Sequence, residues 1–185
     1  MKNVIASIFI SVFLAFHLSS NAQPIFLGTT DTVTFFSETP VANIDAKSTQ
    51  GVGAVNQSTK DVFFKVAMKS FVFKKALMQE HFNENYVESD KFPYATFKGK
   101  ITDNVDLSKD GTYNVSVTGD FTVHGVTKPR TIPGTITIKG NNMQVKTSFD
   151  VKLADHNITI PTVVATEIAE VVNVKVNGML TNSPK

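Results

Sequence analysis

The sequence predicts an all-β protein, an antiparallel β-barrel of about eight strands in meander order with one helix packed at an end. Three observations predict it. Apolar and polar residues alternate along most of the chain, which is the period of half-buried strands. Glycine-containing turns separate these segments, and one stretch has its apolar residues at helical spacing instead. A meander of about eight twisted strands tends to close, because closure removes exposed edges.

Residues 1–22 are expected to form a cleaved signal peptide. Lys2 gives a positive start, Val4–Phe16 is an apolar run, and Ser20 and Ala22 are small residues before the cleavage point. The run is too short for a comfortable membrane span, although a single-span anchor is the alternative. We therefore expect a periplasmic or secreted protein that does not span the membrane after cleavage. Its one domain is expected to cover residues 23–185.

Strand-like alternation is strongest in four segments. They are Asp61–Lys69, Thr112–His124, Met143–Leu153 and Val171–Leu180. Weaker strands are expected at Thr32–Ser37 and Tyr94–Ile101. Glycine readily accepts the positive φ of tight turns. Hairpin turns are therefore expected at Lys109–Gly111, at Gly125 and at Gly140–Asn142.

The helical exception runs from Lys74 to Asp90. Its apolar stripe comprises Leu77, Met78, Phe82 and Tyr86, and Pro93 prevents a longer helix. A second irregular segment, Ile158–Ala169, is expected to place Pro161 in a loop with a short helix after it.

Composition excludes several functions. The chain has no cysteine, which rules out disulfides, iron–sulfur ligation and thiol catalysis. Removal of residues 1–22 leaves 17 basic against 16 acidic residues, without a clustered basic stripe, so no nucleic-acid partner is expected.

The sequence contains none of the catalytic or metal-binding motifs considered next. His81, His124 and His156 share no H-x-x-x-H or H-x-H spacing, so no metal site is expected. No G-x-S-x-G elbow occurs, and the acid pair Glu80 and Glu84 fits a solvated helix face. We therefore predict no catalytic residues, no cofactor and no enzyme. His124 is expected to bond a backbone group beside its turn, and His81 either to lie at a cavity mouth or to be simply exposed.

Two blocks carry a family resemblance. They are HFNENYVESDKFPYATFKGKI (residues 81–101) and VTGDFTVHGVTKP (residues 117–129), and both resemble the YceI-like family of bacterial proteins. The resemblance implies a lipocalin-like barrel, export to the periplasm and a long apolar channel. It also implies binding of polyisoprenoid chains of the quinone or polyprenyl phosphate type, and often a homodimer.

Strand parity then nominates the channel wall. Eight residues are expected to form the wall and three helical ones to close an end: Phe64, Val66, Met68, Phe97, Val115, Val117, Phe121 and Phe149, with Leu77, Met78 and Phe82. A barrel of this size can fill its interior with side chains or hold one ligand, so ordinary core packing is the alternative at each position.

Three functions remain open from the sequence. The leading hypothesis is non-enzymatic carriage or sequestration of a polyisoprenoid or other long-chain lipid. The alternatives are a structural or stress-response protein with a solid barrel, and an enzyme acting on bound lipid through His81.

Overall fold

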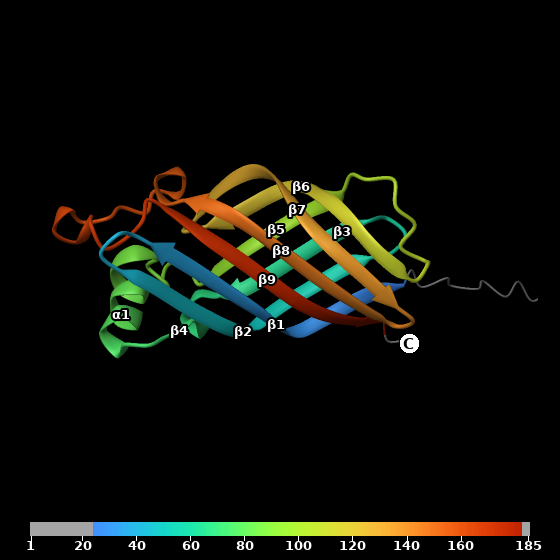
Figure 1. The fold of residues 1–185 in the computed structure, drawn as a ribbon, viewed down its shortest axis with the longest axis horizontal. Coiled ribbons are helices and arrows are strands. Elements are labelled where there is room, and N and C mark those ends of the chain that lie inside the picture. The colour runs from blue at the N-terminus through green and yellow to red at the C-terminus, as the bar shows by residue number, and fades with distance from the viewer. Residues whose placement is uncertain (1–23, 183–185) are drawn as a thin grey trace, which may run out of the picture.

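A computed structural model describes residues 24–182, so the predicted signal peptide lies outside the described residues. The all-β fold is confirmed. Eight long antiparallel strands form the barrel: β1 (Ile25–Glu38), β2 (Asn43–Asn56), β3 (Asp61–Ala67), β5 (Tyr94–Ile101), β6 (Gly111–Val123), β7 (Val126–Lys139), β8 (Asn142–Lys152) and β9 (Val171–Asn182). Each pairs with its neighbours in sequence, and β1 pairs with both β2 and β9, which closes the barrel (Figure 1).

One further strand lies at the rim. The two-residue β4 (Val72–Phe73) pairs with Ala46 and Lys47 of β2, at the part of β2 beyond its pairing with β3. It brings the chain from the end of β3 to the helix.

The helix is shorter than predicted. It comprises α1 (Ala76–His81) and a wider π-helical turn, η2 (Phe82–Tyr86), instead of all of residues 74–90. Lys75 is extended, so the helix cannot begin before it, and Val87 donates its N–H to the Phe82 carbonyl to end the last turn. Three short 3-10 turns complete the chain: η1 (Met68–Ser70), η3 (Leu153–His156) and η4 (Thr162–Val164). η4 is the short helix expected after Pro161.

Two of the three hairpin turns that were predicted from glycine positions occur in the structure. His124 and Gly125 have φ of 51° and 71° and join Val123 directly to its partner Val126. Gly140, with φ of 56°, begins the turn between β7 and β8. The third expectation is wrong, because residues 102–110 form a longer loop and Gly111 already belongs to β6. The side chain of Leu107 from this loop is fully buried.

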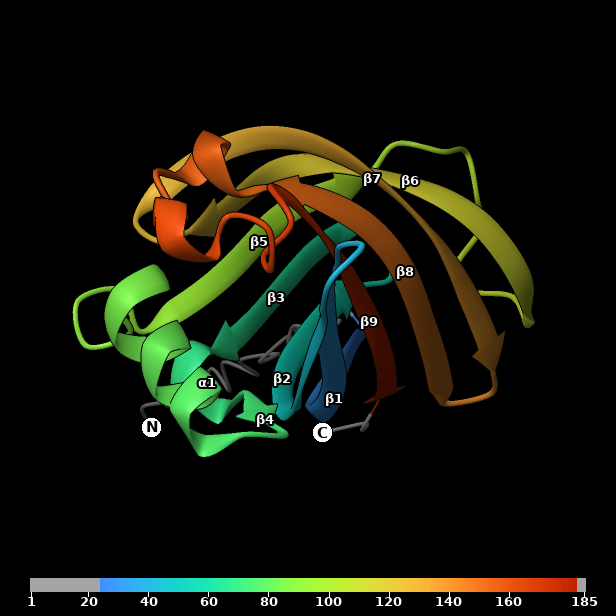
Figure 2. The same ribbon diagram turned by 60° about the vertical axis from the view of Figure 1, so that its left-hand side comes forward.

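Because the strands form a meander, alternate connections lie at the same end. α1 and the connection from residue 153 to 170 border one end of the barrel (Figure 2). The loop of residues 102–110 covers the other, where a tightly packed group of nine buried residues fills the interior: Phe26, Val55, Ile101, Leu107, Val115, Ile136, Ile138, Met143 and Leu180. We call this group the plug.

Candidate functional site

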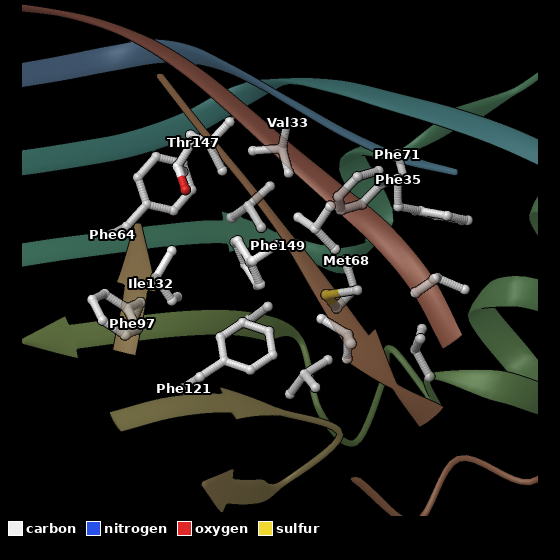
Figure 3. Close-up of a pocket in the computed structure, with 18 of the residues that line it drawn as sticks. Val33, Phe35, Phe64, Met68, Phe71, Phe97, Phe121, Ile132, Thr147 and Phe149 are labelled. Atoms are coloured by element: carbon white, nitrogen blue, oxygen red, sulfur yellow. The ribbon is translucent and has the colours of Figure 1, made fainter. Parts of the chain in front are cut away.

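The half of the barrel beyond the plug contains a cavity of about 320 Å³. This volume is within the range of small-molecule sites in proteins. Side chains from all eight long strands and from the helix line it, and nearly all are apolar. Phe64, Phe97, Phe121 and Phe149 point into the same space from different strands (Figure 3). The interior is therefore solid in one half and hollow in the other.

The alternating pattern explains this wall. Successive side chains of a strand point to opposite faces, so every second residue of a barrel strand faces the interior. On β3 these are Val62, Phe64 and Val66, and on β9 they are Val172, Val174 and Val176. The many small valines leave space that leucine or phenylalanine would fill.

Ten of the eleven nominated residues line the cavity. They are Phe64, Val66, Met68, Met78, Phe82, Phe97, Val115, Val117, Phe121 and Phe149. The placement of Leu77 was wrong, because its side chain is 60% exposed and lies outside the lining. Met78 and Phe82 are one helical turn apart and share the inner face, whereas Leu77 is rotated away by about 100°. That the ten residues bind a ligand stays a prediction.

Sequence reasoning missed part of the wall. Ile132 of β7 lies between Pro129 and Pro133, and proline usually argues against a central strand. Phe71 and Phe73 lie on the short η1–β4 connection, which carries no periodic signal.

Four aromatic side chains cover the cavity at the helix end. The ring centroid of Phe82 lies 5.4 Å from that of Phe35, 5.8 Å from Phe71 and 5.0 Å from Phe73. These distances are in the range of favourable aromatic pairs. The four rings join β1, β4 and the helix, and we call them the aromatic lid.

The ionisable side chains of the lining gather at the same end. They are His81 and Tyr86 of the helix and Glu167 of the 153–170 connection, and His81 and Glu167 are exposed. Burial, with a contribution from the Glu167 charge, raises the pKa of Tyr86. We call this exposed end of the cavity the mouth. The alternatives left open for His81 are both met, since it is exposed and borders the cavity.

A histidine network fixes the loops near the mouth. His124 bonds a backbone group as expected, since its Nδ1 lies 2.9 Å from the His156 carbonyl oxygen. Its Nε2 lies 2.8 Å from Glu88 Oε2, so the ring lies between the two oxygen atoms. The hydrogen bond from His124 lowers the pKa of Glu88. His156 donates from Nδ1 to the Val126 carbonyl, and burial lowers its pKa. These hydrogen bonds therefore connect the segments that carry Glu88, His124 and His156.

A buried carboxylate lies in the barrel wall outside the cavity lining. Asp31, on β1, is only 2% exposed, and its Oδ1 accepts a hydrogen bond of 3.0 Å from the Met179 N–H. Its Oδ2 has no hydrogen-bond partner among residues 24–182, and burial raises the pKa of this carboxyl. Sequence reasoning missed Asp31, which lies just before the weak strand expected at Thr32–Ser37.

Residues 24–182 contain neither a membrane-spanning helix nor a metal-binding cluster. Within residues 24–182, no helix has the length and apolar character needed to cross a membrane. The same part of the chain contains no cluster of three histidine, aspartate or glutamate side chains suited to a metal ion.

A closed antiparallel barrel with an apolar hollow defines a lipocalin-like protein with the architecture of a small-molecule binder. The chain belongs to the YceI-like family, because the model of the YceI-like domain matches residues 22–180. No curated protein sequence matches the chain significantly.

Solved structures have the same fold. A polyisoprenoid-binding domain from Saccharophagus degradans is 15% identical, with a TM-score of 0.74 over 87% of this chain and 99% of that one. BcnA from Burkholderia cenocepacia is 16% identical, with a TM-score of 0.68 over 82% and 96%. The Campylobacter jejuni YceI protein is 14% identical, with a TM-score of 0.55 over all of both chains. At these identities the similarity shows the fold alone.

Proposed function

We propose that this protein binds a long-chain isoprenoid lipid in the cavity and carries or sequesters it without changing it chemically. The observation that carries the proposal is the hollow half of the barrel, whose wall is almost entirely apolar. The polyisoprenoid-binding domain with the same fold supports this class of ligand. The proposed location is the periplasm or the outside of the cell.

The free energy available is sufficient for tight binding. Each CH₂-sized group removed from water contributes roughly 0.8 kcal/mol. At about 0.3 kcal/mol per heavy atom, a ~40-carbon chain reaches ~12 kcal/mol, which corresponds to roughly nanomolar affinity. Methyl branches on such a chain pack against valine and phenylalanine without polar contacts.

A binding role also fits the polar residues of the lining. Within the described residues, no hydrogen bond joins His81, Tyr86 and Glu167 to one another, so they do not form a linked nucleophile and base. Their position at the mouth leaves the rest of the cavity wall without ionisable side chains.

Native mass spectrometry with organic extraction tests the proposal. We expect residues 23–185, purified from the native compartment, to carry a stoichiometric prenyl-chain species that denaturation releases. Val117→Phe should abolish that mass, because the larger side chain projects into the cavity from its floor. Thr118→Phe, on the next and outward-facing position of β6, is the matched control and should retain the lipid.

A lipid-free mass that does not change when long-chain isoprenoids are added would contradict the proposal. It would favour the alternative of an interaction protein. The same spectra report the oligomeric state and so test the predicted homodimer.

A further inference from the structure

The backbone pairing between β7 and β8 is shorter than either strand. The β7–β8 ladder runs only from Gly134 paired with Thr147 to Lys139 paired with Asn142. β7 nevertheless begins at Val126, and β8 continues to Lys152. Residues 126–133 pair with β6 and residues 148–152 pair with β9, but not with each other. We call the interval between these two segments the seam.

The cavity comes close to the outer surface where the ladder stops. A concavity on the outside of β6–β9 shares six lining residues with the cavity: Val115, Pro133, Gly134, Thr135, Thr147 and Val176. At this point the same residues therefore border the cavity on the inside and the concavity on the outside. Gly134 adds no side chain to the wall, and a side-chain hydrogen bond from Thr147 Oγ1 to the Pro133 carbonyl (2.6 Å) joins the two strands where the ladder stops.

Arg130 lies in the seam. It is two residues before the inward-facing Ile132, and its Nη1 donates a 2.6 Å hydrogen bond to the Asp150 carbonyl of β8. Its guanidinium carbon lies 5.8 Å and 5.9 Å from the ring centroids of Phe121 and Phe149. Both rings line the cavity, so Arg130, which is not itself part of the lining, lies directly behind two of its aromatic side chains.

The charge of Arg130 has no anionic partner in the described part of the chain. None of the ion pairs of residues 24–182 includes it, and its hydrogen bond to the Asp150 carbonyl uses one of five N–H donors. The other charges bordering the seam region are of both signs, and Asp150 of β8 is one of them. Lys146 and Lys175 line the outer concavity with Asp103, and Lys128 and Asp155 lie close enough to affect His156.

We propose that the seam is a lateral opening of the cavity, and that Arg130 binds the anionic head group of an amphiphile whose chain lies inside. The planar guanidinium suits phosphate or carboxylate oxygens, which it can bind through two parallel hydrogen bonds. The mouth is unsuited to such a head group, because Glu167 is its charged residue and repels an anion. This inference rests on the proposed function and specifies its head-group class.

Two probes with one chain test the proposal: geranylgeranyl monophosphate and the uncharged geranylgeraniol, titrated calorimetrically into the purified protein. We expect the phosphate to bind more tightly. Arg130→Gln should weaken phosphate binding about ten-fold or more, since a charge-assisted pair is lost, and leave alcohol binding within about two-fold. Lys139→Gln, at the paired end of the same strand, is the matched control and should change neither affinity.

A measurement on the unaltered protein guards against a variant that folds poorly. The preference for phosphate over alcohol should shrink when salt rises from about 0.01 M to about 1 M, because screening weakens only the charged contact. An equal change for both probes in Arg130→Gln, no change for either, or no preference at low salt would overturn the head-group site while the carrier function stands. Failure of both probes to bind would overturn both proposals.

Discussion

Asp31 occupies a space that glycines leave open. A Cβ atom on Gly53 would lie 2.7 Å from Asp31 Oδ2, and one on Gly28 would lie 2.6 Å from Oδ1. The β1–β2 register shifts on both sides of Asp31, so a bulge turns this residue inward. The carboxyl is thus buried by backbone geometry, without a cation to pair with it.

The pH dependence of stability should report this burial. The raised pKa means that the folded protein holds this proton at pH values where the unfolded chain, with its usual value near 3.8, has lost it. Stability from this group is therefore present below pH 3.8 and falls as pH rises through the raised pKa. We expect Asp31→Asn to have a larger free energy of unfolding than the native protein at neutral pH.

Urea unfolding at a series of pH values checks this expectation. The difference in free energy of unfolding between Asp31→Asn and the native protein should disappear as the pH is lowered until Asp31 is protonated in both the folded and the unfolded chain. Asp120→Asn, on the exposed side of β6, is the control and should show no such trend. A difference that is constant with pH would show that the Asp31 carboxyl is not responsible.

At the scale of elements, the helix closes the barrel through one of its faces. Phe82 contacts three other rings of the aromatic lid, whereas Leu77 lies on the solvent side of α1. The helix itself contains only six α-helical residues, too few to be stable alone. Its position therefore depends on the packing of the aromatic lid.

Phe82→Ala tests this dependence. We expect a loss of roughly 2–3 kcal/mol in the free energy of unfolding, below the range for a fully buried phenylalanine because the ring is partly exposed. Release of bound lipid, followed by stopped-flow fluorescence, should also be faster. Leu77→Ala on the same helix should change stability by less than about 0.5 kcal/mol. Equal effects of the two variants would rule out a closing role for the aromatic lid.

At the scale of the whole molecule, the plug and the cavity occupy different halves of the barrel. The plug has no exposed member, and Met143, Leu107 and Phe26 are essentially inaccessible to solvent. Val115 belongs to the plug and also lines the cavity, and Val117 of β6 packs against the plug and lines the cavity. One half thus resembles a close-packed protein core, and the other a ligand site.

Leu107→Ala tests whether the plug contributes to stability without affecting lipid affinity. We expect it to cost roughly 2–5 kcal/mol of stability, because its side chain is surrounded by the plug and leaves a cavity there. Lipid affinity, measured by titration below the unfolding temperature, should be unchanged. A large loss of affinity would show that the plug and the cavity are not independent.

The fold was predictable because local and global signals agree. Alternation along Thr112–His124 identified β6, and the positive φ of Gly125 fixed its hairpin with β7. Eight wall residues followed from strand parity, and Met78 and Phe82 followed from helical spacing. Prediction failed for Leu77 on the outer side of the helix and for Ile132 between two prolines.

Other features depend on contacts that a linear pattern does not contain. The inward turn of Asp31 requires a bulge opposite glycines from three segments of the chain. The seam depends on where two strands stop pairing, although both continue in sequence. The choice between a packed and a hollow interior depends on how the volumes of side chains from eight strands add up in space.

The plug also closes one end of the cavity, so it limits the length of a lipid chain that the proposed site can bury. A chain entering the barrel gains burial with each isoprene unit until its end meets Val115 and Val117. Further units remain outside, where they add length but little affinity. For the proposed ligand, chains above a threshold length should therefore bind with almost the same affinity. They should differ in the length of tail that stays outside the cavity, accessible to a membrane or an acceptor protein.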